Sequence, residues 1–265
     1  MHTPDPNISL SLITFAYNEE DGLERQIAQW TQELDRFVAD WEIVLVNDAS
    51  TDSTRDVADA LSARDPRIRV VHKDKNGGVG RAIGTARAHV SKNWVFWNDI
   101  DGHFDLKDLE KVLPYLRDPD VDLLVCFKHD NMGGKSSSFQ WFKSRANYYL
   151  LRLLFVSGIR DFQFVQFYPR QYFCQGIELE AYSSFVPPEC VLKAQALELN
   201  IRQIQLRYVS HPARASKTTL RAIIISVFNI FTFWWRWRFG GGRKQTLAHY
   251  QNVFGGGKPW RKSSS

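Results

Sequence analysis

The sequence is poor in cysteine, and it lacks a segment typical of secretion at its start. The three cysteines, Cys126, Cys174 and Cys190, lie far apart and form no CxxC pair. This spacing argues against a disulfide framework and against a zinc site, and it favours a reducing compartment. No signal peptide follows the polar residues 1–7, so we expect a cytoplasmic protein.

Acidic side chains are absent after Glu198, whereas lysine and arginine continue toward the end of the 265-residue chain. A basic region of this kind is typical of proteins with an anionic partner, such as nucleic acid, phospholipid headgroups or a phosphorylated substrate. A solvated basic face is the alternative. The hydrophobic content of 44 % is enough for a sizeable core.

The apolar run over residues 222–235 is too short for a bilayer span, which needs roughly 20 residues. Arg236 and Arg238 follow it, and tryptophans lie at its end. The pattern therefore predicts an interfacial helix anchored at lipid headgroups. Packing on the core or in a dimer is the alternative.

Short apolar runs alternate with segments of helical periodicity over the first 130 residues. Continuous apolar strands are typical of a largely parallel sheet with helices on both faces. Polar clusters follow the strands that end at Phe15, Val46 and Trp97. Because ligands bind at the carboxyl ends of parallel strands, these clusters are the expected site. The expected strands cover residues 8–15, 41–46, 68–72, 94–97 and 121–127, with a late strand at 202–209.

Two carboxylates separated by one residue follow the strand 94–97. On an extended segment Asp99 and Asp101 point to the same side, and His103 continues this period of two. Paired carboxylates suit a hard cation, Mg²⁺ or Mn²⁺, that bridges to substrate phosphates. Imidazole suits Mn²⁺ better than Mg²⁺ as a third ligand. The alternative is a turn in which an aspartate caps the next helix.

Two further acids, Glu19 and Asp48, follow the first and second expected strands. Carboxylates in this position can accept hydrogen bonds from a base or a ribose. Ser50, Thr51 and Ser53 can cap the following helix, and capping alone is the alternative for this loop.

Residues 78–84 spell GxGxxxG between a strand and a helix, as in dinucleotide-binding loops. The motif follows the third expected strand instead of the first, so a nicotinamide-dependent oxidoreductase is the alternative function. A nucleic-acid-binding module would use the basic tail and explain none of the strand-end acids. We therefore expect no nucleic-acid partner.

The sequence resembles the family 2 glycosyltransferases, which have a GT-A-type nucleotide-binding fold. Within that family it is most similar to the polyprenyl-phosphate sugar transferases, such as dolichyl-phosphate mannosyltransferase. This narrower similarity continues, more weakly, through Arg160-Asp161, residues 167–170, Glu189 and residues 211–217. The segments that carry the family resemblance are Phe15-Ala16-Tyr17-Asn18-Glu19-Glu20, residues 42–52, Asn76-Gly77-Gly78 and Asn98-Asp99-Ile100-Asp101.

The resemblance implies roles for individual residues. Ala16, Tyr17 and Glu19 would line the nucleoside pocket, and Asp48 would hold the base. Asp99 and Asp101 would act around the metal and the diphosphate. His103 stands where the lipid-phosphate subgroup carries a glutamine metal ligand. Arg214 and Lys217 would face a phosphate of the donor or of the lipid acceptor.

Two departures from the family pattern leave the substrates open. Asn47 and Ala49 stand where the family often has Asp and Gly, and both lie in the base-recognition loop. Residues 161–167 lack the Ser-Gly pair common in the lipid-phosphate subgroup. The first departure concerns the nucleotide and the second the acceptor.

The resemblance implies an inverting transfer of a sugar from a nucleotide-diphosphate sugar by direct displacement. Asp99 would be catalytic because negative charge develops on the leaving diphosphate beside it. A hydroxyl acceptor needs a general base, for which Asp161 and Glu189 are candidates, whereas a phosphate acceptor is already anionic. The expected acceptor is a polyprenyl phosphate or another lipid-linked group, and the alternative is a soluble or cell-envelope saccharide.

We therefore expect three parts. Residues 1–215 form the catalytic domain, residues 216–240 a membrane-interface or dimerisation helix, and residues 241–265 a flexible basic tail. The expected partners are the sugar donor, a lipid phosphate at the cytoplasmic face of a membrane and, in the dimer alternative, a second copy of the chain.

Overall fold

Seven strands form one mixed sheet in the computed structural model, which describes residues 3–128, 149–155, 157–209 and 220–261. The order across the sheet is β3-β2-β1-β4-β6-β5-β7. The strands are β1 (Asp5–Ala16), β2 (Val38–Asn47), β3 (Ile68–His72), β4 (Trp94–Trp97), β5 (Leu123–Lys128), β6 (Gln166–Pro169) and β7 (Ile201–Leu206).

Most neighbouring strands run parallel, as the apolar runs predicted. β1 pairs in parallel with β2 and β4, β2 with β3, and β5 with β7. The short strand β6 is antiparallel to both of its neighbours. Its four residues, Gln166–Pro169, were not expected as a strand, because their sequence has no continuous aliphatic run.

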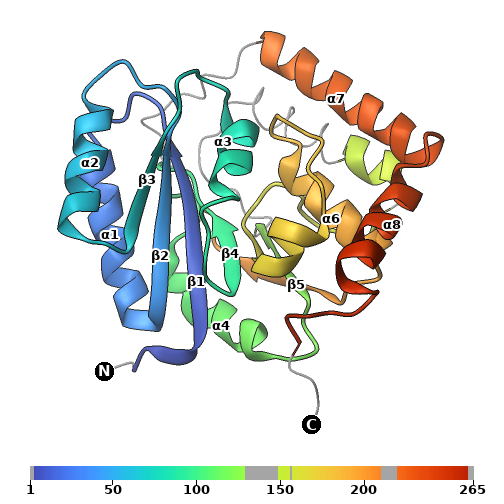
Figure 1. The fold of residues 1–265 in the computed structure, drawn as a ribbon, viewed down its shortest axis with the longest axis horizontal. Helices are drawn as coiled ribbons and strands as arrows, with labels where there is room; N and C mark the ends of the chain where they lie inside the picture. Colours follow the sequence, from blue (N-terminus) through green and yellow to red (C-terminus); the bar gives the residue numbers. More distant parts are fainter. Residues whose placement is uncertain (1–2, 129–148, 156, 210–219, 262–265) are drawn as a thin grey trace.

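Helices cover both faces of the sheet (Figure 1), which confirms the predicted fold class. The apolar face of α1 lies against the sheet through Leu23, Ile27, Trp30 and Leu34, which recur at helical spacing. The helices are α1 (Leu23–Phe37), α2 (Thr54–Arg64), α3 (Val79–Ala86), α4 (Leu109–Arg117), α6 (Val186–Ala196), α7 (Leu220–Arg238) and α8 (Gly242–Phe254), with the short turns η1 (Leu106–Asp108) and η2 (Tyr172–Gly176).

Each strand sends alternate side chains into two separate cores. Ile43 and Leu45 of β2 belong to the core under α1, α2 and α4, whereas Val44 and Val46 belong to the core under α3, α6 and α7. This alternation follows from the period of two along a strand. Because both faces are covered, the central strands are apolar throughout, which is the pattern visible in the sequence.

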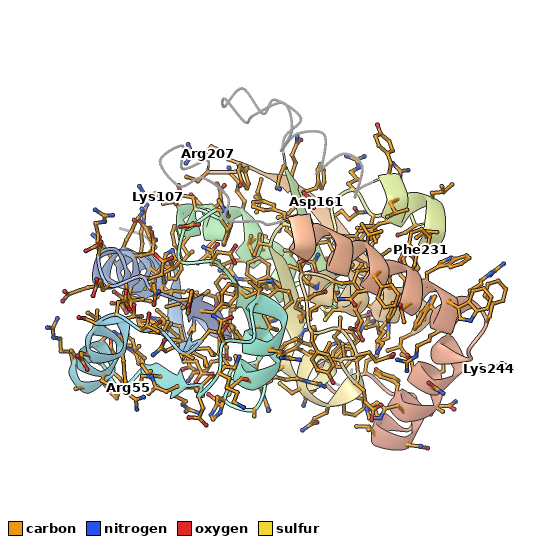
Figure 2. All side chains as sticks on the ribbon, turned by 90° about the horizontal axis from the view of Figure 1, so that it is seen from above. Arg55, Lys107, Asp161, Arg207, Phe231 and Lys244 are labelled. Atoms are coloured by element: carbon orange, nitrogen blue, oxygen red, sulfur yellow. The ribbon has the colours of Figure 1, made fainter. Side chains whose placement is uncertain are left out.

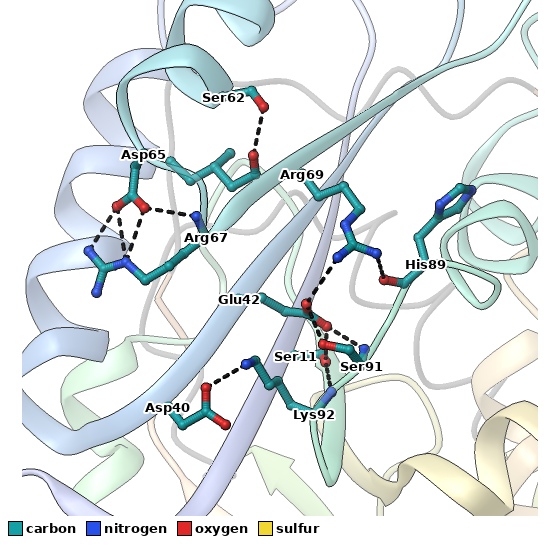
Figure 3. A network of polar contacts seen from close by, with 11 residues as sticks. Ser11, Asp40, Glu42, Ser62, Asp65, Arg67, Arg69, His89, Ser91 and Lys92 are labelled. Atoms are coloured by element: carbon teal, nitrogen blue, oxygen red, sulfur yellow. Dashed lines mark hydrogen bonds and ion pairs between the residues drawn. The ribbon is translucent and has the colours of Figure 1, made fainter.

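A buried acid, Glu42, joins three segments at the amino-terminal side of the sheet (Figure 3). Its carboxylate accepts hydrogen bonds from the hydroxyls of Ser11 and Ser91, each at 2.7 Å. Arg69 lies 4.0 Å from it and also donates to the carbonyl of His89. These contacts join β1, β2 and the turn before β4. The buried carboxylate of Glu42 therefore has all of these partners within the chain.

The C-terminal region differs from the flexible tail that the two glycine triplets suggested. Residues 242–254 form α8, which packs against α6, α7 and η2, and Tyr250 is buried. Gly241 precedes α8 with a φ of 76°, a left-handed conformation that favours glycine. The glycines therefore make the turn between two packed helices. In the part of the chain that the structure describes, no helix is long and apolar enough to cross a bilayer.

Candidate functional site

The chain reverses its direction of travel across the sheet between β1 and β4. From β1 it moves outward to β2 and β3, and then returns to place β4 on the other side of β1. Ligands of open α/β sheets bind in the crevice at the carboxyl ends of such strands. Here those ends are Ala16 of β1 and Trp97 of β4, directly before Tyr17 and Asn98. The predicted strand-end clusters therefore meet at the carboxyl ends of the strands, which we call the site edge.

The loops after β1 and β2 are joined by hydrogen bonds in both directions. Asn18 Oδ1 accepts from the Thr51 amide at 2.9 Å, and the Asn18 amide donates to Ser50 Oγ at 3.1 Å. The Glu19 amide donates to Thr54 Oγ1 at 2.8 Å. The structure thus places Ala16, Tyr17 and Glu19 at the start of one loop, with Tyr17 exposed and Ala16 buried beneath it.

Asp48 is buried where the loops after β2 and β3 meet. Its carboxylate accepts hydrogen bonds from the amides of Gly77 and Gly78, the shorter at 2.7 Å, and it forms an ion pair with Lys73. The alternative for this loop was capping of α2 by Ser50, Thr51 or Ser53, and Ser53, which stands at the N-cap, makes no side-chain capping hydrogen bond. The sequence predicted that Asp48 holds a base; in this conformation its carboxylate holds the glycine turn.

The same contacts argue against the dinucleotide alternative for residues 78–84. The amides of Gly77 and Gly78 point to Asp48, and the turn follows β3 at the edge of the sheet instead of β1. A side chain at Gly80 would lie 2.5 Å from the backbone of Ser183. This glycine therefore allows α3 to approach the segment 182–183, and a pyrophosphate-binding role has no support in this geometry.

Asn98, which the sequence predictions did not single out as a site residue, closes the loop that carries the two aspartates. Its amide group donates to the carbonyl of Phe104 at 2.9 Å and accepts from the amide of Phe104 at 3.2 Å. Asn98 is buried, and the Gly102 amide donates to the carbonyl of Asp99 at 2.7 Å. The loop 99–103 is thereby held at both ends. A polar residue that ends an apolar strand was the available signal.

The electrostatics of this loop single out Asp99. Burial raises its pKa, and the neighbouring Asp101 raises it further, while His103 opposes the shift. A carboxylate in this situation is stabilised by an added positive charge. Shifted pKa values of this origin are common at functional sites.

His103 lies against Tyr208, with ring centroids 4.9 Å apart and an interplanar angle of 18°. Its Nδ1 lies 3.2 Å from the carbonyl oxygen of Val209. Since a carbonyl only accepts, Nδ1 carries the proton in the neutral ring and the lone pair is on Nε2. An orienting contact of this kind is typical of metal-binding histidines.

The described residues contain no group of three His, Cys, Asp or Glu side chains placed to hold a metal ion by themselves. Asp99, Asp101 and His103 share one loop, but they do not form a closed protein cage. Mg²⁺ usually keeps several waters and binds one or two carboxylates together with substrate phosphates. The two carboxylates fit that kind of incomplete site.

Two further groups reach this edge from the other half of the sheet. The pKa of Tyr208 is raised by burial and by the charges of Asp99, Asp101 and Asp161. Lys128, at the carboxyl end of β5, places its ammonium 4.6 Å from the Tyr208 ring centre. Neither Tyr208 nor Lys128 was predicted, although the end of an apolar strand was a signal for Lys128.

Asp161 and Glu189, the two predicted general bases, have different surroundings. Asp161 Oδ1 accepts from the amides of Gln163 and Phe164, and its charge is felt at Tyr208 beside the aspartate loop. Glu189 is fully buried; it accepts from the amides of Glu180 and Ala181 and pairs with Lys193 at 2.7 Å. A base must reach the substrate, so this geometry assigns Glu189 a structural role instead of the predicted catalytic one. Arg214 and Lys217 lie outside the described residues.

Comparison with known proteins places this arrangement in a family. The chain is 30 % identical over 170 residues to "Dolichyl-phosphate beta-glucosyltransferase ALG5A" of Trichomonas vaginalis, covering 60 % of this chain and 52 % of that protein. It is 26 % identical over 236 residues to "Glycosyltransferase AglD" of Haloferax volcanii, covering 86 % of this chain and 37 % of that protein. The chain thus spans about half or less of these relatives.

A similar fold occurs in glucosyl-3-phosphoglycerate synthase from Mycobacterium tuberculosis, solved in complex with Mn²⁺, UDP and glucosyl-3-phosphoglycerate. The TM-score is 0.60 at 18 % identity, and the match covers 94 % of this chain and 81 % of that one. At this identity the likeness concerns the fold. The family model described as "Glycosyl transferase family 2" matches residues 11–174, more than half of the chain. The chain therefore belongs to glycosyl transferase family 2.

Proposed function

We propose that this protein is a metal-dependent, inverting hexosyltransferase that moves a sugar from a nucleotide-diphosphate sugar to a lipid-linked phosphate acceptor. The observation that carries the proposal is the aspartate loop at the carboxyl end of β4, where burial and Asp101 raise the pKa of Asp99. Such a site gains from a cation. The loop lies next to the joined loops after β1 and β2, where a nucleoside would bind.

The donor set fits a divalent cation of the Mg²⁺ or Mn²⁺ type. Asp99 and Asp101 would hold it through carboxylate oxygens, and His103, the predicted third ligand, lies on the same loop with its Nε2 lone pair unused by the Val209 contact. When bound, the cation supplies positive charge beside the leaving diphosphate. The chain's own groups orient this site, because Asn98 fixes the loop at Phe104 and Val209 fixes the ring of His103.

Thermal shift with nucleoside diphosphates tests the donor half of the proposal. We expect one nucleotide to raise the melting temperature only when Mn²⁺ is present, because the cation and the diphosphate bind together. At a ligand concentration of about 100 times Kd the stabilisation is about 2.7 kcal/mol. Asp101→Asn should abolish the shift.

Asp56→Asn is the matched control, because Asp56 is an exposed acid on the outside of α2. It should leave the nucleotide shift unchanged. The donor proposal is wrong if no nucleotide stabilises the wild type with Mn²⁺, or if the stabilisation survives in Asp101→Asn.

The lipid-phosphate acceptor is supported by similarity to a relative named as a dolichyl-phosphate glucosyltransferase. A phosphate acceptor is anionic and attacks without losing a proton to the enzyme. The test supplies radiolabelled nucleotide sugar with polyprenyl phosphate or with free saccharides. We expect label in the organic phase with the lipid; label transferred only to saccharides would contradict this.

Transfer to a saccharide hydroxyl is the second candidate, and the position of Asp161 favours it. Burial raises the pKa of Tyr208, and the charges of Asp99, Asp101 and Asp161 raise it further. A candidate base therefore lies close enough to the aspartate loop to affect the same side chain. For a hydroxyl acceptor, Asp161→Asn should reduce kcat about 10²- to 10⁴-fold. For a phosphate acceptor, kcat should stay within a few-fold of the wild type, so this variant separates the two candidates.

A further inference from the structure

One face of α7 is apolar and exposed. Phe228, Phe231 and Trp235 recur at helical spacing, and Phe239 follows directly after the helix; their exposed fractions are 69, 45, 61 and 63 %. The opposite face is buried: Phe233 packs on Phe185 with ring centroids 5.0 Å apart. The helix is therefore apolar on both sides, and only one side is covered within the described chain.

The helical segment 149–155 lies beside α7. Trp234 Nε1 of α7 donates to the carbonyl of Leu154 at 2.9 Å, which fixes the two helices to each other. Tyr149 and Leu153 of that segment are 57 and 77 % exposed. We call the six exposed side chains the aromatic surface: Tyr149, Leu153, Phe228, Phe231, Trp235 and Phe239. Figure 2 shows Phe231 on α7 along one flank of the molecule.

Basic side chains gather beside the aromatic surface, at the junction of α7 and α8, whereas the carboxylates of Glu178 and Glu180 contact His249 of α8 and Arg236 of α7. Arg238, Arg243 and Lys244 are exposed at the junction of α7 and α8, and no acidic side chain follows Glu198 in the sequence. Arg236 is the exception in being paired, through an ion pair of 2.9 Å with Glu180. An open hollow on α7 is lined by Phe231, Thr232, Trp234, Trp235 and Arg236.

We propose that the aromatic surface docks onto an anionic lipid bilayer, with Trp235 and its aromatic neighbours in the headgroup region and Arg238, Arg243 and Lys244 facing the lipid phosphates. Amphipathic tryptophan rings and basic side chains are the groups that prefer this boundary. A second copy of the chain fits less well. A symmetric dimer would bring each basic cluster toward its own copy, and like charges across an interface are unfavourable.

The docked orientation would bring the site close to the lipid. In Figure 1 β1 starts near the N-terminus at the lower edge and runs upward, and α7 crosses the upper part of the molecule. Arg236 also connects α7 to Glu180, in the segment whose residue Ser183 packs against Gly80 of α3. This inference deepens the proposed function and rests on it, since a lipid-linked acceptor lies in a bilayer.

Flotation of the full chain with vesicles tests the surface without any substrate. We expect the wild type to float with phosphatidylcholine vesicles that contain phosphatidylglycerol, and much less with phosphatidylcholine alone. Phe231→Ser combined with Trp235→Ser should weaken binding roughly 100-fold, because each lost aromatic is worth about tenfold. Replacing Arg238, Arg243 and Lys244 with glutamine should remove the preference for the anionic vesicles.

Tyr115→Ser is the control, since Tyr115 is an exposed aromatic on α4, away from this surface. It should float like the wild type. Both aromatic replacements are at exposed positions, and unchanged thermal unfolding would verify the fold. The proposal is overturned if the wild type does not float with anionic vesicles, or if the double variant floats equally well. It is also overturned if sedimentation shows a dimer that Trp235→Ser dissociates while vesicles stay unbound.

The nucleotide and Mn²⁺ thermal shift, measured on the same double variant, separates this proposal from the proposed function. If the double variant keeps the thermal shift but no longer floats, its aromatic side chains serve membrane docking and not donor binding. If the wild type floats but shows no thermal shift, the donor site is wrong and membrane docking stands.

Discussion

Asp122 is fully buried and Asp99 is partly buried, and their pKa values shift in opposite directions. Burial alone would raise the pKa of Asp122, but donors from Arg261, Lys258 and the Asn200 amide hold it below the ordinary value of 3.8. The pKa of Asp99 is raised, because burial and Asp101 outweigh His103. The chain supplies the counter-charges of Asp122 itself. At Asp99 only His103 opposes the shift. This is the difference that we expect between a structural acid and an acid that binds a cation.

Glu189 belongs with Asp122 on the structural side of this comparison. It is buried with Lys193 and fixes the amides of Glu180 and Ala181, which precede the segment packed against Gly80. Each of the following variants tests whether an acid behaves like Asp122 or like Asp99.

The largest effect is expected for Glu189→Ala. This change leaves the ammonium of Lys193 buried without its closest carboxylate, and breaking such a pair costs about 3–5 kcal/mol. Urea unfolding measures the loss. If Glu189 were instead a catalytic base, stability would be nearly preserved and kcat alone would fall.

Asp122→Asn should have the next largest effect, a loss of about 2 kcal/mol, because four donors lose a charged acceptor. Asp120→Asn is the matched control, since Asp120 is exposed and uses its backbone carbonyl to bind Asn200 and Arg261. Equal unfolding free energies for the two variants would remove Asp122 from the structural class.

Asp99→Asn should change the free energy of unfolding in the opposite direction. Removing one of two close negative charges should stabilise the metal-free protein by roughly 1 kcal/mol, as is common where function opposes stability. The same variant should lose the stabilisation by Mn²⁺ and nucleotide. A destabilised Asp99→Asn protein would place Asp99 with Asp122 after all.

The smallest effects are those of pH. The folded-state pKa of Asp122 is depressed, so its stabilisation is present above its ordinary value of 3.8 and is lost as the pH falls through the folded pKa. The folded-state pKa of Asp99 is raised. Ionised Asp99 therefore destabilises the folded protein fully above the folded-state pKa, and this effect disappears as the pH falls toward 3.8. Unfolding of wild type, Asp99→Asn and Asp122→Asn between neutral and acidic pH measures both. Parallel stability curves would contradict this.

The sequence predicted the first half of the fold well for a physical reason. Strands buried on both faces must be apolar throughout, and the predicted strands 68–72 and 94–97 match β3 and β4. The antiparallel strand β6 was missed because its residues, Gln166–Pro169, carry no such run. Helix α8 was missed because glycines that form a left-handed turn look the same in sequence as glycines in a flexible tail.

The candidate site could be predicted only where position along the chain determines it. Asp99, Asp101 and Glu19 follow strands, so the topology brings them to one edge. Glu189 was misassigned because a sequence does not show whether a carboxylate faces a cleft or a core. Asn98 acts through the backbone of Phe104, a contact within a loop that no spacing rule describes.

The donors of Asp122 also set an order of events during synthesis. Lys258, Trp260 and Arg261 lie 136, 138 and 139 residues after it. At about 5–20 residues per second, a ribosome needs roughly ten seconds to supply them. Until then Asp122, directly before β5, lacks the two cations that pair with it, so we expect this half of the sheet to close last. Pulsed hydrogen exchange on nascent chains would contradict this if β5 became protected before residue 258 emerged.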